Sequence, residues 1–223
     1  MNDTNLKFYD QLLRLHLFQG VGRSDLAQIV GHSKIGFETI SEGAIIANEG
    51  TGYDNMKFII NGTAKAIATA EDKQYAIEEY ISAPYTIQPE KMFGLSQSFS
   101  RTFVADSRCN IITMSKEEIL KLTDEILIFR LNLLNTYTTM IQKRENKLWQ
   151  LQQATLEDKI AKWIIDRCLT NIGPKTIKIK MKTLGEELND SRLDISRALN
   201  RMKQKGVIEL SRGKIFVPQA KML

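Results

Sequence analysis

The sequence predicts an α+β fold, in which an N-terminal domain of antiparallel strands and one long helix precede a small C-terminal domain of helices and a β-hairpin. Three observations predict it. Short apolar runs alternate with turn residues over about 34–115, apolar residues recur seven apart over 127–148, and two short helical patterns and a hairpin follow in the last third. A chain of 223 residues can form two modest domains, each with its own core. We expect domains at 1–123 and 155–223, connected by a helix over 124–154.

The strands of the N-terminal domain are indicated by the runs FETI, AIIA, MKFII and TAKAIATA, which are separated by turn residues in SEG and NEGTGYDN. Asn61-Gly62, between the last two runs, predicts a hairpin, because a type I′ turn needs a positive φ at both central positions. Several short strands with glycine turns favour a sandwich or jelly roll whose interior can hold a ligand.

Helical periodicity begins at SKEEILKLTDE and continues for about thirty residues without Gly or Pro. Apolar residues spaced by seven predict a seam between two helices, and here they are Leu127, Leu134, Ile141 and Leu148, with Leu131 between the first two. Other intermediate positions are polar, so a helix lying across its own domain is the alternative. We expect a homodimer, because so long a helix exceeds what one small β domain can cover.

The segment LGEELNDSRLDISRALNRMKQKGVIELSRGKIFV predicts two short helices separated by Asn189-Asp190, and then a hairpin with residues 211–213 at its tip. Ser191 is a suitable N-cap for the second helix, and Asp194 can complete a capping box by reaching back to the Ser191 backbone N–H. The apolar stripe that would face the core consists of Ile195, Leu199 and Met202.

The exposed N-terminal half of that second helix then carries Arg192, Ser196 and Arg197, where a helix-turn-helix reads the major groove. Arginine can donate two hydrogen bonds to O6 and N7 of guanine. Arg201 lies further along, and we expect it to meet phosphate. The full set of residues expected to contact double-stranded DNA is Lys182, Thr183, Ser191, Arg192, Leu193, Ser196, Arg197, Arg201, Lys203, Arg212 and Lys214.

The distribution of charge agrees with a nucleic-acid partner. Residues 156–223 hold 15 Lys and Arg against 8 Asp and Glu, whereas residues 1–155 hold 16 against 18. The net charge of +5 therefore comes from the C-terminal third of the chain. Such an asymmetry is typical of a domain that binds a polyanion.

Other classes of protein lack their characteristic residues here. Cys109 and Cys168 are the only cysteines, so we expect no disulfide framework and no metal site. We find no nucleophile–base pair, phosphate-binding glycine loop or paired acids, and do not expect an enzyme. No run approaches the roughly 18 to 20 apolar residues that span a bilayer, and the start MNDTNLK resembles no signal peptide. We expect a cytoplasmic protein without a membrane partner.

With both halves considered, the chain resembles the cyclic AMP receptor protein and fumarate–nitrate regulator family of bacterial transcription factors over nearly its whole length. ISEGAIIANEGTGYDNMKFIINGTAKAI is similar to the family's strand–turn pattern, whose turn glycines are matched by Gly43, Gly50 and Gly62. LGEELNDSRLDISRAL resembles its helix-turn-helix, whose DNA-contacting serine and arginines are matched by Ser191, Arg192 and Arg197. The resemblance implies an N-terminal β-roll of the cyclic-nucleotide-binding kind, a dimerisation helix and a C-terminal winged helix-turn-helix.

This sequence departs from the family pattern at positions that contact the DNA bases and the cyclic nucleotide. Leu193 stands where the family usually has a glutamate that accepts a hydrogen bond from cytosine, and a leucine can make only an apolar contact, for instance with a thymine methyl. In MFGLSQSFSRTFVAD, Leu95 replaces the ribose-binding glutamate, while Arg101-Thr102 matches the pair that meets the cyclic phosphate. We therefore expect a different DNA site, and we do not expect cyclic AMP as the ligand.

On the long helix, the family's hydroxyl residues that face the nucleotide base correspond to about Arg144 and Glu145, which changes the chemistry of the pocket. The residues expected to form the effector pocket are Phe93, Gly94, Leu95, Arg101, Thr102, Arg144 and Glu145. No cofactor is indicated, and the effector itself is not identified by the sequence.

These expectations describe a homodimeric, sequence-specific DNA-binding transcription regulator that selects a pseudo-palindromic site and responds to a small effector in the β-roll. RNA polymerase would be a further partner of an activator. One alternative is a small-molecule sensor whose winged domain contacts proteins, and another is a nucleic-acid-processing enzyme that docks through its basic domain. The charge distribution disfavours the first, and we find no catalytic acids or metal cluster for the second.

Overall fold

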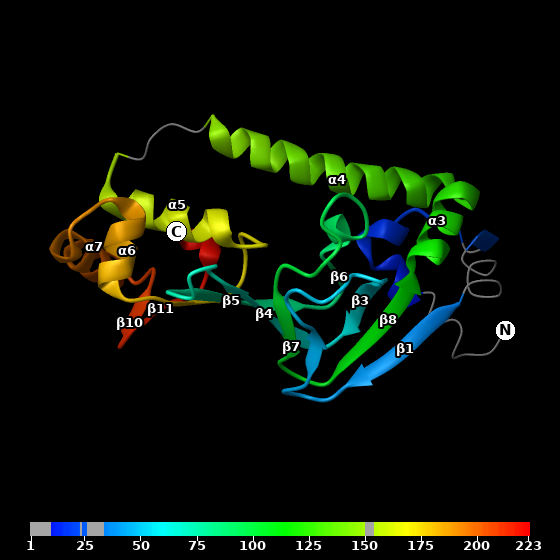
Figure 1. The fold of residues 1–223 in the computed structure, drawn as a ribbon, viewed down its shortest axis with the longest axis horizontal. Coiled ribbons are helices and arrows are strands. Elements are labelled where there is room, and N and C mark those ends of the chain that lie inside the picture. Colours follow the sequence, from blue (N-terminus) through cyan, green and yellow to red (C-terminus); the bar gives the residue numbers. More distant parts are fainter. Residues whose placement is uncertain (1–9, 23, 26–33, 150–153) are drawn as a thin grey trace. The chain divides into compact units, whose positions relative to one another are not determined.

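The computed structural model describes residues 10–22, 24–25, 34–149 and 154–223. Their contacts separate two compact units (Figure 1). Unit 1 holds the chain up to Ala64 together with Ser82–Leu148, and unit 2 holds Lys65–Ile81 together with Trp149–Leu223. The predicted division at 1–123, 124–154 and 155–223 did not anticipate that a hairpin from the N-terminal half packs with the C-terminal residues.

Unit 1 is built on an antiparallel sheet in the order β1-β8-β3-β6. These strands are β1 (Ile35–Ile40), β8 (Cys109–Ser115), β3 (Asn55–Asn61) and β6 (Tyr85–Ile87). A second antiparallel pair consists of β2 (Ile45–Ala47) and β7 (Thr102–Ala105). Alternate strand residues such as Met56, Phe58 and Phe103 are fully buried. The predicted β-rich domain is confirmed.

The Asn61-Gly62 turn differs from the prediction. Gly62 has a φ of +94°, whereas Asn61 is not among the residues with positive φ. The flanking strands also belong to different sheets, because β3 pairs with β8 and β6 while β4 (Thr63–Thr69) lies beside β5 (Ala76–Ser82). The predicted type I′ hairpin is therefore wrong. Glycine is needed because the chain changes sheets close to another segment, where a Cβ on Gly62 would lie 2.5 Å from the Arg108 carbonyl oxygen.

The predicted helical stretch is divided in two by Ile126. Helix α3 (Lys116–Glu125) ends there and α4 (Leu127–Leu148) follows, because Ile126 takes an extended conformation with its side chain buried. Ser115 caps α3 by accepting a hydrogen bond from the Glu118 backbone N–H. Of the predicted helix at 124–154, residues 150–153 lie outside the described residues.

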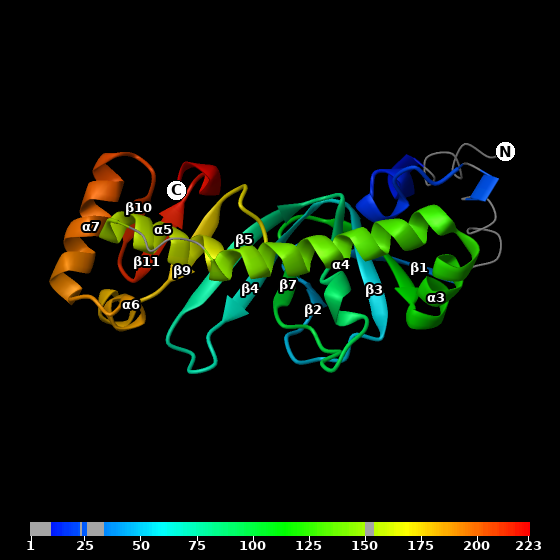
Figure 2. The same ribbon diagram turned by 90° about the horizontal axis from the view of Figure 1, so that it is seen from above.

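One face of α4 packs against the rest of unit 1 (Figure 2). Phe129 and Leu133 are buried, and the Phe129 ring centroid lies 5.1 Å from that of Phe18, in the short helix η1 (His16–Phe18). The Asn132 side-chain amide donates to the carbonyl oxygens of Leu17, at 3.2 Å, and Gln19, at 2.8 Å. These contacts set which face of α4 remains free.

That free face carries the predicted seam. Leu127, Leu131, Leu134 and Ile141 are between 45% and 64% exposed, which is unusual for a row of large apolar side chains. The side chain of Leu148, the last residue expected in the seam, lies outside the described residues. Within one chain, therefore, the described seam residues are left largely uncovered.

Unit 2 combines the β4–β5 hairpin with the C-terminal elements. The strands run in the order β4-β5-β9-β11-β10, with β9 (Lys175–Lys178), β11 (Lys214–Val217) and β10 (Glu209–Ser211) all antiparallel to their neighbours from β5 onward. The helices are α5 (Leu156–Arg167), α6 (Met181–Leu188), α7 (Arg192–Gln204) and the short η3 (Ala220–Met222). The predicted helices and terminal hairpin are confirmed. Ile77 of the hairpin lies in the same core as Trp163, Leu184 and Leu199.

A buried ion pair joins the hairpin to β9. Glu79 on β5 and Lys175 on β9 are both 0% exposed, and the Lys175 Nζ lies 2.9 Å from the Glu79 Oε2. The carboxylate also accepts from the backbone N–H groups of Leu169 and Thr170, while Nζ donates to the Thr170 hydroxyl and the Ile172 carbonyl. Charges can be buried at tolerable cost only when both partners are satisfied in this way.

Candidate nucleic-acid interface and effector cavity

The turn between α6 and α7 brings the two helices close together. Asn189 ends α6 in the left-handed conformation, with φ +55°. A Cβ on Gly185 would lie 2.7 Å from the Asp190 carbonyl oxygen, so the approach of α6 to the turn requires glycine. Helix α7 then begins from Ser191, whose hydroxyl accepts from the Asp194 backbone N–H at 3.1 Å and donates to the Asp194 carboxylate at 2.7 Å. The predicted N-cap is confirmed, although Asp194 bonds the hydroxyl of Ser191 and not its backbone N–H.

The two faces of α7 differ as the periodicity predicts. Ile195, Leu199 and Met202 are buried, together with Ala198. On the other side, Arg192, Leu193 and Arg197 near the helix N-terminus are exposed, and Ser196 is half-buried. The Arg197 guanidinium lies 3.5 Å from the Asp194 carboxylate, a solvent-exposed contact that contributes little to stability. The first turns of α7 thus present arginines and an apolar side chain to solvent.

Beside this face, α6, α7 and the terminal hairpin enclose a groove of about 610 Å³. Its apolar floor includes Leu184, Leu199 and Ile215. Its basic residues are Lys180, Lys182, Arg192, Arg212 and Lys214. All of these except Lys180 were predicted to contact DNA. Lys180 precedes α6, and the alternation of lysines in KIKMK was the available signal for it.

Three other residues of the predicted DNA-contacting set differ in their surroundings. Thr183 is buried, and its hydroxyl donates to the Gln74 side-chain oxygen at 3.3 Å. Arg201 contacts the carboxylate of Glu157 on α5, and this hydrogen bond holds the pKa of the Glu157 carboxyl below its usual value. Lys203, in the last turn of α7, is exposed. Thr183 is therefore not on the exposed face, and Arg201 has a partner within the protein.

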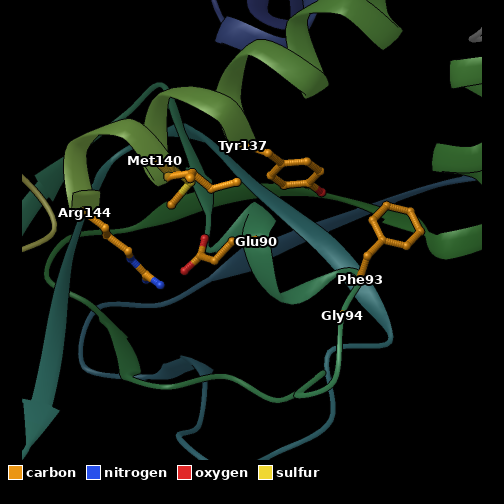
Figure 3. A pocket seen from close by; sticks show the side chains of 7 residues that line it. Glu90, Phe93, Gly94, Tyr137, Met140 and Arg144 are labelled. Atoms are coloured by element: carbon orange, nitrogen blue, oxygen red, sulfur yellow. The ribbon is translucent and has the colours of Figure 1, made fainter. Parts of the chain in front are cut away.

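A second cavity, of about 290 Å³, lies within unit 1 between α4 and the segment that begins at η2 (Pro89–Lys91) (Figure 3). Seven residues line it: Glu90, Phe93, Gly94, Tyr137, Met140, Ile141 and Arg144. Those from α4 are spaced i, i+3, i+4 and i+7, so they occupy one helical face. That spacing is the signal by which the sequence could have indicated them.

Among the described residues, some polar groups at this cavity have hydrogen-bond partners and others do not. The Tyr137 hydroxyl donates to the Pro89 carbonyl at 3.0 Å, and burial, aided by the charge of Glu90, raises the pKa of Tyr137 to about 12. Burial and the same carboxylate also raise the pKa of Tyr53. One carboxylate oxygen of Glu90 is buried without a hydrogen-bond partner among the described residues. The Arg144 guanidinium forms no ion pair within that part of the chain either.

The structure gathers only part of the predicted effector pocket. Phe93, Gly94 and Arg144 line the cavity, whereas Leu95 and Glu145 are exposed outside its lining. The other two predicted residues also lie outside that lining: Arg101 is half-buried, and the Thr102 hydroxyl accepts from the Glu49 backbone N–H at 3.2 Å. Sequence interpretation missed Glu90, Tyr137, Met140 and Ile141.

Comparison of the chain with protein-family models gives no match, and comparison with curated protein sequences gives none either. In the described part of the chain, no helix is both long and apolar enough to cross a membrane.

Solved structures, in contrast, are similar over most of the chain. The catabolite activator protein of Thermus thermophilus matches with a TM-score of 0.53 and 16% identity, covering 93% of this chain and 95% of that one. The sensor domain of the transcriptional regulator DNR from Pseudomonas aeruginosa gives 0.55 and 17%, covering 68% and 100%. The c-di-GMP-responsive global regulator CLP of Xanthomonas campestris gives 0.51 and 13%, covering 88% and 99%. At these identities the likeness establishes the fold, so the chain has the α+β architecture of these regulators, with an N-terminal β-roll, a long helix and a C-terminal helix-turn-helix with a hairpin wing.

Proposed function

We propose that the protein is a cytoplasmic, homodimeric, sequence-specific DNA-binding transcription regulator of the cyclic AMP receptor protein and fumarate–nitrate regulator family, acting by binding and not by catalysis. The observation that carries the proposal is the capped helix α7, which exposes Arg192, Leu193 and Arg197 beside a groove lined by lysines and arginines of α6 and the wing. The similar folds of solved transcriptional regulators support it.

The residues divide by their expected task. Arg192 and Arg197 lie near the α7 N-terminus, which enters the major groove in a helix-turn-helix, so they would contact base edges. Leu193 would contact a thymine methyl. Lys214, at the wing, would contact phosphate and supply affinity without sequence preference.

The uncovered apolar row on α4 is the expected contact with a second copy of the chain. Four large side chains in a heptad-like row would be buried by the same row of a partner helix. A two-fold dimer would place two α7 helices on half-sites about one helical turn apart, so the preferred DNA would be a pseudo-palindrome.

Ile141 belongs to both the α4 row and the lining of the 290 Å³ cavity. A ligand in that cavity would therefore contact a residue of the proposed dimer seam. This shared residue supports control of the regulator by a small effector, and RNA polymerase would be a further partner of an activating form.

The DNA-reading role is tested by selection from a random DNA pool, followed by titration of the selected site and of random DNA at several salt concentrations. Arg197→Ala should cost about 1–3 kcal/mol on the selected site and leave random DNA almost unchanged. Lys214→Ala is the matched comparison, and it should weaken both DNAs alike and reduce the salt slope by about one unit. Failure to enrich a palindrome, or equal losses with Arg197→Ala on both DNAs, would contradict the proposal.

The dimer is tested by sedimentation of the parent chain and of Leu134→Glu combined with Ile141→Glu. The parent should be dimeric at micromolar concentration, and the double variant should be monomeric, because two carboxylates would enter an apolar seam. Thr139→Glu with Gln142→Glu, at exposed positions of α4 outside the row, should leave the dimer intact. A monomeric parent would show that the row has another role.

A further inference from the structure

The cavity against α4 has two chemically different ends. Figure 3 shows the charged groups of Glu90 and Arg144 extending toward one another, with Met140 above them, while the rings of Tyr137 and Phe93 lie toward the other end. A ligand that fills this space would need a compact polar head and an apolar or aromatic tail.

The Glu90 side chain offers an acceptor that the protein leaves unused. One of its oxygens is buried without a hydrogen-bond partner among the described residues, and such a group costs free energy unless a ligand or water satisfies it. Because the terminal torsion of a glutamate is broad, the carboxylate can turn toward a donor in the cavity at little cost. The natural complement is a cationic N–H group.

Arg144 offers the opposite charge in the same space. It lies one turn of α4 beyond Met140 and Ile141, and its guanidinium forms no ion pair in the described residues. A guanidinium binds a carboxylate through two parallel hydrogen bonds, so it would fix the orientation of an acidic group. At one end, the cavity therefore presents Arg144, which can bind an anionic group, and Glu90, which can bind a cationic group.

We propose that the cavity binds an α-amino acid with an apolar or aromatic side chain. Its ammonium group would donate to Glu90, its carboxylate would accept from Arg144, and its side chain would lie among Met140, Tyr137 and Phe93. An α-amino acid carries both charged groups on one carbon atom, as the proximity of the two side chains requires. A volume of about 290 Å³ is at the lower end for ligand sites and suits so small a molecule. The inference rests on the proposed function in treating this cavity as the effector site.

The test is calorimetric titration of the full chain with L-phenylalanine, L-leucine and L-methionine, and with two analogues of the first. Phenylpropanoate lacks the ammonium group, and phenethylamine lacks the carboxylate, while both keep the aromatic tail. At least one of the amino acids should bind, and for L-phenylalanine each analogue should bind roughly tenfold or more weakly, because each leaves one protein charge unpaired.

Variants assign each charge to its residue. Glu90→Gln should remove most of the preference for L-phenylalanine over phenylpropanoate, and Arg144→Gln should remove most of the preference over phenethylamine. Lys143→Gln is the matched control, since Lys143 is an exposed cation beside Arg144 that does not line the cavity. It should leave all affinities unchanged. If a variant fails to fold, the titrations of the parent chain with the amino acids and the two analogues still decide the proposal.

Binding of none of the three amino acids, or equal affinity for the amino acid and its analogues, would overturn the inference. So would micromolar binding of cyclic AMP or cyclic GMP that is lost in Arg144→Gln, because a nucleotide would then be the occupant. The DNA selection described above is independent of these titrations. If the chain selects a palindrome but binds no amino acid, the proposed function stands and this inference is wrong. If it binds an amino acid but selects no palindrome, this inference stands and the DNA-binding function is wrong.

Discussion

Two glutamates from the same half of the sequence, Glu79 and Glu90, are in opposite electrostatic situations. Glu79 is fully buried in unit 2, where it accepts hydrogen bonds from Lys175 and from two backbone N–H groups. Glu90 lines a cavity in unit 1 with one oxygen that lacks a partner among the described residues. Arg144, a cationic residue that lines the same cavity, forms no ion pair with it.

The difference distinguishes a structural charge from a binding charge. A buried charge that is fully satisfied contributes to holding elements together and has no capacity left for a ligand. A carboxylate that is left incompletely satisfied beside a cavity costs stability, and this cost is repaid only when something binds there. The comparison can be tested by substituting the charged and hydrogen-bonding residues of each site in turn.

Removing the cation from the satisfied site should have the largest effect. Lys175→Met leaves the Glu79 carboxylate buried without its counter-charge, and should lower the free energy of unfolding of unit 2 by about 3–5 kcal/mol. Tryptophan fluorescence in a urea titration measures this, because both tryptophans of the chain, Trp149 and Trp163, belong to unit 2. Lys178→Met, at the partly exposed Lys178–Glu78 pair, is the control and should cost no more than about 1 kcal/mol. Equal losses would mean that the buried pair is no more important than the exposed one.

Neutralising both partners should restore part of that loss. Glu79→Gln keeps an acceptor for the Leu169 and Thr170 N–H groups, so Glu79→Gln combined with Lys175→Met leaves no lone buried charge. The double variant should be more stable than Lys175→Met alone by about 0.5–3 kcal/mol, the range of coupling energies for residues in contact. The same urea titration completes the double-mutant cycle, and strict additivity of the two single changes would argue against an ionic contact.

In the cavity, the hydroxyl of Tyr137 should have an intermediate effect. Tyr137→Phe loses the hydrogen bond to the Pro89 carbonyl and should cost about 0.5–1.5 kcal/mol. Because burial raises the pKa of Tyr137 to about 12 from an unfolded value near 10, its contribution is present below pH 10 and is lost as the pH rises toward 12. Thermal unfolding between pH 8 and 11.5 should therefore show a steeper alkaline decline in the parent than in the variant. Parallel curves would contradict the assignment.

The smallest effects are expected at the two charged residues of the cavity. Glu90→Gln and Arg144→Gln should each change the free energy of unfolding of the ligand-free protein by less than about 0.5 kcal/mol, since neither breaks an ion pair among the residues that the structure describes. Circular dichroism melts of both variants beside the parent measure this. A loss comparable to that of Lys175→Met would show that the two residues stabilise the fold and are not reserved for a ligand.

Much of the C-terminal helix-turn-helix was predictable, because its signals are local. Ser191 as an N-cap, the buried stripe of Ile195, Leu199 and Met202, and the turn after Leu188 all follow from residues within one or two helical turns. The exposed arginines of α7 follow from the same periodicity. Arg201 was the exception, since its partner Glu157 comes from a different helix far along the chain.

The cavity against α4 was less predictable, because its lining comes from two distant segments. The family resemblance indicated Phe93, Gly94 and Arg144, but nothing local to Glu90 shows that its carboxylate lines a cavity against α4. The i, i+3, i+4, i+7 spacing of Tyr137, Met140, Ile141 and Arg144 identifies a helical face but not what it faces. Leu95, next to Gly94, was expected in the pocket and lies exposed.

By itself, the sequence determined the order of the β-rich, long-helical and helix-turn-helix segments, the capped helix α7 and the apolar row on α4, because hydrophobic period, capping residues and glycine turns act over a few residues. Only the tertiary structure decided that Asn61-Gly62 joins two sheets and that residues 65–81 complete the core of unit 2. It also decided that Glu79 is paired, while one oxygen of Glu90 has no partner in the described part of the chain. These depend on contacts between residues far apart in the chain, and the identity of a side chain does not reveal which distant partner the fold brings to it.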